Sequence, residues 1–172
     1  RAGEFVTFRE VLEEVGPDAA RYYLVAFSPD TAVTFDLEAA KRQSMDNPVY
    51  YLQYAHARMC SLEEFAAEQG VARRPLEEVD LSLLTHPSEV ELLRLADRLR
   101  EEVREAAGRR APHRVAGYGL EFATAFHRFY TDCRIVTDDP DLTQARLWLV
   151  EAAKSVVLAV LGILGISAPP RM

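Results

Sequence analysis

Residues 46–61, which read DNPVYYLQYAHARMCS, concentrate side chains that could bind or react within a few helical turns. They include three tyrosines, a glutamine, a histidine and an arginine. Asn47 and Pro48 are residue types that commonly cap and open a helix. An ordinary core helix would carry leucines here, and an ordinary surface helix would carry charges. Flat rings and polar groups at helical spacing therefore call for a specific explanation.

The arginine of this run, Arg58, falls inside a broad apolar arc on a helical wheel. A guanidinium in such a stripe must be paired, stacked on tyrosine rings or extended to a polar surface. We prefer an ion pair with an acidic residue on a neighbouring helix. The alternative is that Arg58 and the tyrosines form part of a ligand or domain interface. The arc and its opposite face comprise Tyr51, Leu52, Tyr54, Ala55, Met59, Leu62, Phe65 and Ala66 on one side, and Val49, Gln53, His56, Cys60 and Glu64 on the other.

Two other clusters could hold a metal ion. His56 and Cys60 lie four residues apart on one helical face, but no second pair stands at a suitable spacing for zinc. Asp138, Asp139 and Asp141 flank a proline ahead of a predicted helix, a pattern more typical of a capping loop than of a cation site. The chain has no glycine-rich phosphate loop, no Gly-x-Ser-x-Gly and no Cys-x-x-Cys. We predict neither a catalytic nor a metal site.

Composition narrows the class of protein. The 172 residues are 49% hydrophobic and 27% charged, as in a soluble globular domain, and the net charge of −7 argues against non-specific nucleic-acid binding. Residues 111–172 are charge-neutral, so contact with a polyanion is expected near this third or at isolated arginines. Cys60 and Cys133 give no disulfide framework, which favours a reducing, cytoplasmic setting. The apolar run at residues 155–166 is too short to span a bilayer, so no membrane partner is expected.

These candidate residues would be positioned by helices, which the pattern predicts from end to end. Thr7 and Asp36 are expected to cap two early helices, and Gly16-Pro17 to interrupt the first. A short extended piece is expected at residues 32–36. The result is an all-α bundle of six to seven helices. The predicted helices cover residues 8–15, 18–27, 37–43, 48–69, 87–107, 111–131 and 142–164.

The run at residues 46–61 closely resembles the segment that opens the helical anticodon-binding domain of the arginyl-tRNA synthetase family. Residues 3–44 resemble the family's stretch after its Lys-Met-Ser-Lys signature, while AFHRFYTDCRI and LGILGISAPPRM resemble its last two helices and terminus. The resemblance covers essentially the whole chain. It implies a connector from the catalytic domain at residues 1–43 and an anticodon-binding domain at residues 44–172.

The resemblance also implies what these residues lack. In the family, Arg1-Ala2-Gly3 would directly follow Lys-Met-Ser-Lys, and the nucleotide-binding fold with its His-Ile-Gly-His-type signature lies further upstream. The chain thus resembles the tRNA-reading part of an arginine–tRNA ligase. ATP and Mg²⁺ would belong to the catalytic domain, and no cofactor is expected here. We expect no amino-acid activation by these residues alone.

Site residues follow from the resemblance position by position. The partners it implies are an arginine tRNA and the protein's own catalytic domain, with the protein expected to be a monomer. For His56 and Arg58 we prefer structural pairing to RNA contact. The rival function is a helical protein-association domain without an RNA-reading role. The implied RNA-binding residues are Asn47, Tyr50, Tyr51, Gln53, Tyr54, Arg58, Tyr130 and Met172.

Overall fold

The computed structural model describes residues 7–28, 30–31, 36–42 and 44–172, and this part of the chain forms helices and no strand. The predicted all-α class is therefore confirmed. The predicted extended piece at residues 32–36 lies almost wholly outside the described residues. The described helices are α1 (Phe8–Val25), α2 (Leu37–Lys41), α3 (Pro48–Glu68), α4 (Pro87–Arg109), α5 (His113–Asp132) and α6 (Pro140–Leu164), with short 3₁₀ turns η1 (Leu76–Glu78) and η2 (Leu81–Leu83).

Helix starts follow the capping residues in the sequence. The Asn47 side chain accepts a hydrogen bond from the Val49 amide (3.1 Å) and so caps α3. Asp139 caps α6 by accepting from the amides of residues 141 and 142, which confirms that the aspartate cluster is a capping loop. Gly16 has φ 79° and breaks the helical geometry of α1, where a helix stop was predicted. The chain resumes as helix directly afterwards.

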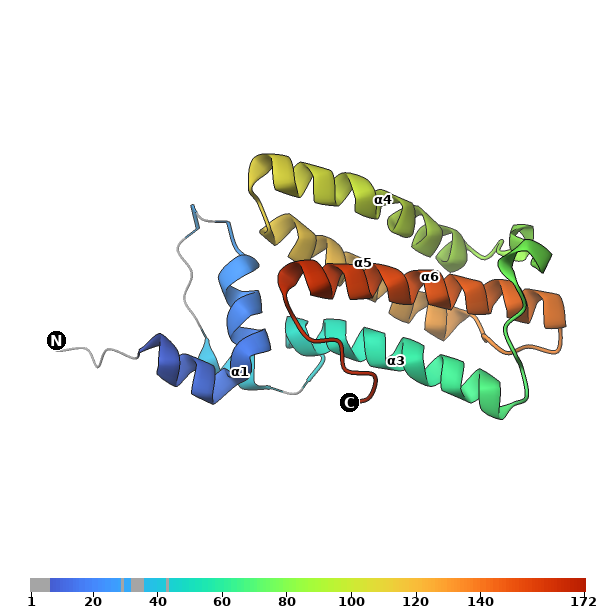
Figure 1. Ribbon diagram of the computed structural model, residues 1–172, viewed down its shortest axis with the longest axis horizontal. Coiled ribbons are helices and arrows are strands. Elements are labelled where there is room, and N and C mark those ends of the chain that lie inside the picture. Colours follow the sequence, from blue (N-terminus) through green and yellow to red (C-terminus); the bar gives the residue numbers. More distant parts are fainter. Residues whose placement is uncertain (1–6, 29, 32–35, 43) are drawn as a thin grey trace.

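The four long helices α3 to α6 lie alongside one another, while α1 and α2 sit against one end (Figure 1). Helix α3 packs on α5 and α6, and α4 packs mainly on α5. All four contribute to one hydrophobic core. Its largest fully buried side chains include Phe122, Phe126 and Phe129 of α5, Leu52 and Met59 of α3, Leu92 of α4, and Leu149 and Leu161 of α6.

Gly119 sets how closely α5 approaches its neighbours. A Cβ atom at this position would lie 2.7 Å from Val160 Cγ1 of α6 and 3.3 Å from Leu52 Cδ2 of α3. Both distances are shorter than ordinary van der Waals contact, so a larger residue would push the three helices apart. Because Gly119 has no side chain, α3, which carries the tyrosine run, can pack closely against α5.

Helix α6 closely matches the helix predicted at residues 142–164, but its apolar part is longer than the run at residues 155–166. An 18-residue window within it has a mean hydropathy of 2.0, enough by length and composition to cross a membrane, so the expectation based on a twelve-residue run was wrong. Half of that window is buried inside the bundle, as befits the core helix of a soluble fold, although Leu158 and Ile163 are exposed.

A buried ion pair joins α4 to α6. The Glu89 carboxylate is 1% exposed and accepts a hydrogen bond from Arg146 Nε at 2.7 Å. Its other oxygen accepts from the His86 amide (2.8 Å) as part of the α4 capping box. Arg146 also donates to the carbonyl of Arg134 (2.7 Å) and so fixes the segment that follows α5. Because both charges are largely desolvated, each depends on the other.

We therefore expect Arg146→Ala to lower the free energy of unfolding by about 3–5 kcal/mol, because it leaves the Glu89 carboxylate buried without its partner. Arg104→Ala, which removes an exposed pair with Glu101, is the matched control and should cost less than about 1 kcal/mol. Urea denaturation measures both. Equal losses in the two variants would show that the Glu89–Arg146 pair is not the tie between α4 and α6.

Candidate nucleic-acid interface

Flat side chains form one continuous stack along α3 and onto α5. The rings of Tyr50 and Tyr54 lie 6.2 Å apart and within 10° of parallel. The Arg58 Cζ lies 5.5 Å from the Tyr54 ring centroid and 3.8 Å from that of Tyr130. The three α3 residues are spaced four apart and so share one helical face. All four side chains are half-buried, which leaves part of the stack open to solvent.

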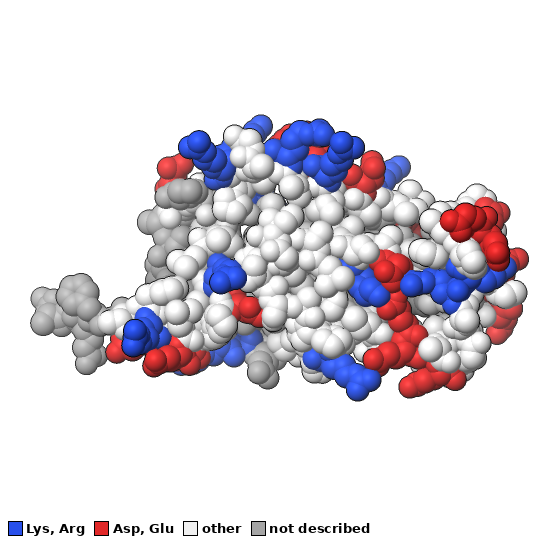
Figure 2. Space-filling view, in the orientation of Figure 1, with Lys and Arg blue, Asp and Glu red and all other residues white. Residues whose placement is uncertain are grey.

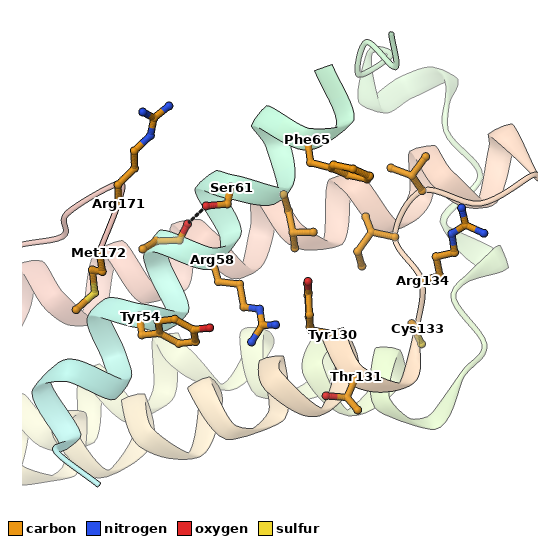
Figure 3. A pocket seen from close by; sticks show the side chains of 14 residues that line it. Tyr54, Arg58, Ser61, Phe65, Tyr130, Thr131, Cys133, Arg134, Arg171 and Met172 are labelled. Carbon is orange, nitrogen blue, oxygen red and sulfur yellow. Dashed lines mark hydrogen bonds between the residues drawn. The ribbon is translucent and has the colours of Figure 1, made fainter. Parts of the chain in front are cut away.

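The stack borders a cavity of about 920 Å³ between α3, the end of α5 and the C-terminus. Figure 3 shows Arg58 projecting into it between Tyr54 and Tyr130, with Met172 at the Tyr54 end. The structure therefore brings together four of the predicted RNA-binding residues. Cavity-lining residues that sequence reasoning missed are Ala57, Ser61, Leu62, Phe65, Thr131, Cys133, Arg134, Ile135, Val136 and Arg171.

The C-terminal tail, residues 165–172, is held on an adjoining face of α3, and its last two residues reach the cavity. Gln53 Nε2 donates to the Ser167 carbonyl (3.0 Å), and Arg171 forms an ion pair with Glu64 (3.0 Å). His56 Nδ1 bonds the Pro169 carbonyl at 2.9 Å. Because a carbonyl only accepts, this nitrogen carries the proton, and Nε2 can accept from Cys60 Sγ (3.7 Å). His56 thus has a structural role here, as preferred from the sequence.

The remaining predicted α3 residues lie outside the main cavity. Asn47, Tyr50 and Gln53 line a second hollow of about 400 Å³, which Met172 also borders. The Asn47 amide is buried and donates to the carbonyls of Ala40 (3.0 Å) and Arg42 (2.8 Å). Both polar side-chain atoms of Asn47, and the Nε2 atom of Gln53, already form hydrogen bonds within the protein. Asn47 holds the end of α2 in place, and Gln53 holds the C-terminal tail.

Tyr51 lies behind the stack, against His127 of α5. Its ring centroid is 4.9 Å from that of His127, and its hydroxyl donates to Thr124 Oγ1 (3.3 Å). Neither ring nitrogen of His127 has a hydrogen-bond partner among the described residues. Burial, together with the nearby Arg58 charge, lowers the pKa of His127 from 6.5 to about 4. His127 is therefore a neutral ring that supports Tyr51 and Tyr54 from below.

The ion pair preferred for Arg58 is wrong for the part of the chain that the structure describes, where no acidic group pairs with it. The rings of Tyr54 and Tyr130 take that place. Wheel geometry alone could not choose between these options, because Tyr130 comes from α5. The helical wheel did place Phe65 in the same arc as Arg58, seven residues further on, but nothing in the sequence showed that it would line a cavity.

In Figure 2 charged side chains are sparse at the centre of the face shown, and they gather along its upper edge and in a band of both signs across its right half. Around the cavity the cationic groups are Arg58, Arg134 and Arg171, of which Arg171 is paired with Glu64. A cavity with flat rings and guanidinium groups can hold unstacked bases and their phosphates.

The described residues offer little for covalent or metal chemistry. No three histidine, cysteine, aspartate or glutamate side chains gather among them as a metal site would need. Burial raises the pKa of both the Cys60 and the Cys133 thiols, which makes them poor nucleophiles. The cavity and the stack beside it are suited to binding a ligand.

Aromatic rings and guanidinium planes at an open cavity suit the unstacked bases of single-stranded RNA loops, so the fold and the site define a helical RNA-binding domain. Comparison with known protein families agrees with this class, since residues 52–172 match the DALR anticodon binding domain. That match spans most of the sequence. The chain belongs to the DALR anticodon-binding domain family.

Similar proteins are arginine–tRNA ligases. Those of Syntrophotalea carbinolica and Symbiobacterium thermophilum are each 49% identical over 172 residues, which is 100% of this chain and 31% of the relative. The chain therefore spans about a third of the length of the curated relatives and corresponds to their C-terminal part. The solved arginyl-tRNA synthetase of Thermus thermophilus matches 98% of this chain and 28% of its own, with 28% identity and a TM-score of 0.75.

Stacking without an acidic partner predicts a modest cost for removing Arg58. We expect Arg58→Ala to lower the free energy of unfolding by about 0.5–2 kcal/mol, the range of a cation–π contact. An orphaned buried ion pair would cost about 3–5 kcal/mol. A double-mutant cycle with Tyr130→Leu, measured by urea denaturation, should show that most of the loss is shared between the two residues. Additive losses would mean that Arg58 and Tyr130 do not stabilise each other.

The lowered pKa of His127 predicts that the fold loses stability in acid. The unfolded chain binds a proton at this histidine below about pH 6.5, whereas the folded chain does so only near pH 4. Stability is thus fully present above pH 6.5 and falls as the pH drops towards 4, by at most about 1.4 kcal/mol per pH unit. We expect His127→Phe to reduce the loss of thermal midpoint between about pH 7 and about pH 5. An unchanged acid slope in the variant would contradict this assignment.

Proposed function

We propose that this chain reads the anticodon arm of an arginine tRNA as the C-terminal part of an arginine–tRNA ligase. The observation that carries the proposal is the stack of Tyr54, Arg58 and Tyr130 at a cavity where the tail also ends. The DALR family match and the arginine–tRNA ligase relatives support it.

In the proposed complex, an unstacked anticodon-loop base enters the cavity and lies against the flat stack. Aromatic rings and guanidinium planes both accept a base face, while base edges remain open to hydrogen bonding. Met172 closes the Tyr54 end of the cavity, and its flexible thioether can pack on a base. The tail that carries it is bonded at Ser167, Pro169 and Arg171 and so is not frayed.

The other predicted RNA-binding residues act in this proposal mainly by positioning. Gln53 holds the tail and Asn47 holds the start of α3, so both set where the stack and Met172 lie. Tyr50 extends the stack towards the second hollow, and Tyr51 supports it from behind. RNA approaching Tyr50 would thus lie close to Met172, which borders both hollows.

The remaining parts of the ligase reaction belong elsewhere in the parent protein. Residues 1–43 would connect to the catalytic domain, which would bind ATP and Mg²⁺ and attach arginine to the tRNA. With a net charge of −7, these residues would bind tRNA weakly alone, because much of the phosphate contact would come from the missing part. The parent would act in the cytoplasm as a monomer. A purely protein-associating role is not favoured by the family match.

We expect Tyr130→Ala and Met172→Ala each to weaken binding of the arginine tRNA by the full-length protein. Loss of one stacking contact is worth about 1–3 kcal/mol of RNA affinity. Tyr130→Phe is the matched control, since it keeps the ring and should keep most of the affinity. Binding is measured at fixed salt, and thermal midpoints are recorded beside it. Unchanged affinity in both alanine variants, or losses explained by unfolding, would refute the proposal.

A further inference from the structure

The cavity is larger than one base requires. Its volume of about 920 Å³ is near the upper end of the roughly 300–1,000 Å³ found for small-molecule sites. The stack of Tyr54, Arg58 and Tyr130 occupies one part of its wall. The other part is formed by side chains that the proposed single-base contact leaves unused. Figure 3 shows Phe65 and Arg134 at the end opposite Met172.

Phe65 is a large apolar side chain that remains 48% exposed although a hydrophobic core lies nearby. It follows Arg58 by seven residues on α3, so it points to the same side about 10 Å further along the helix. Ile135 and Val136, from the segment after α5, line the cavity with it. The ring therefore lies on an apolar wall, on the same side of α3 as Arg58, and about half of the residue is open to solvent.

Arg134 provides a positive charge without an acidic partner on the wall of the same cavity. Its side chain is exposed and makes no ion pair or hydrogen bond within the described ranges. Its backbone is fixed, because its carbonyl accepts from Arg146 at 2.7 Å. Nearby acids have other partners, since Glu64 pairs with Arg171 and Asp132 with Arg128 (3.6 Å). A free guanidinium on a fixed backbone is suited to binding a phosphate.

We propose that Phe65 and Arg134 form a second nucleotide subsite. Phe65 stacks on the base next to the one held against Tyr130, and Arg134 binds the phosphate between the two nucleotides. An exposed ring and a free cation on the wall of one cavity match the two chemical parts of a nucleotide, a flat apolar base and an anion. A spacing of about 10 Å along α3 leaves room for an extended, unstacked strand. This inference rests on the proposed function.

The test uses the full-length protein and the isolated anticodon stem–loop of the arginine tRNA as the probe. Probe variants carry one abasic position each within the loop. Phe65→Ala and Arg134→Gln are compared with Tyr130→Ala. Leu93→Ala and Arg100→Gln, on exposed positions of α4, are the matched controls. Thermal midpoints confirm that the variants fold, as expected for substitutions of exposed side chains.

We expect Phe65→Ala to weaken binding about 5- to 100-fold, and this loss should vanish with a probe that is abasic at one loop position. That position should neighbour the one at which the effect of Tyr130→Ala vanishes. Arg134→Gln should weaken all probes alike and reduce the slope of log affinity against log salt by about 0.7. The control variants should bind as the parent does.

Two negative outcomes are distinct. If Tyr130→Ala weakens binding but Phe65→Ala and Arg134→Gln behave like their controls, the second subsite is refuted and the proposed function stands. The subsite is refuted equally if Phe65 and Tyr130 lose their effects at the same abasic position. If none of the three variants changes affinity, the proposed function itself is refuted and the subsite with it.

Discussion

The contact between the Arg58 guanidinium and the Tyr130 ring, 3.8 Å from Cζ to centroid, decides the shape of the site. It joins the middle of α3 to the end of α5, and the cavity opens beside it. The face of an aromatic ring carries partial negative charge, so it can compensate a half-buried cation without removing it fully from water. An acidic partner would have neutralised the arginine. A ring leaves its charge available to an anionic ligand.

Two adjoining faces of α3 are used. One face carries the stack, and the other carries Gln53, His56 and Glu64, which hold the C-terminal tail. Asp18 of α1 also bonds Ser167, through the backbone amide at 3.2 Å and the hydroxyl. The first helix, α3 and the last residues of the chain therefore meet at Ser167. The contacts with the tail explain why α3 carries the polar residues Gln53 and His56 on a face that is partly covered by protein.

Electrostatics at the site differ from the average over the chain. The net charge is −7, yet Glu64 and Asp132, which adjoin lining residues of the cavity in sequence, pair with Arg171 and Arg128. Arg58 and Arg134 have no acidic partner within the described part. The neutral ring of His127 beneath the stack adds no competing charge near neutral pH. A local cationic surface on an acidic domain favours selective contact with a loop over general attraction to a polyanion.

Much of the fold could be predicted from the sequence because helix capping and apolar periodicity are local. Asn47, Gly16 and Asp139 mark helix boundaries that the structure confirms, since each acts through its own backbone neighbours. The run at residues 46–61 likewise identified the helix that carries the candidate site. The resemblance to the arginyl-tRNA synthetase family added Tyr130 and Met172 to the candidate site, which residue spacing alone could not have done.

Tertiary structure decided which side chains meet. Whether Arg58 pairs with an acid or a ring depended on where the end of α5 lies, and that depends on the close approach at Gly119. The apolar arc of α3 did not show that Phe65 would stay exposed, because exposure depends on which helices cover the arc. The sequence determined the helices and their faces through interactions a few residues long. The partners of those faces were set by packing between residues far apart in the chain.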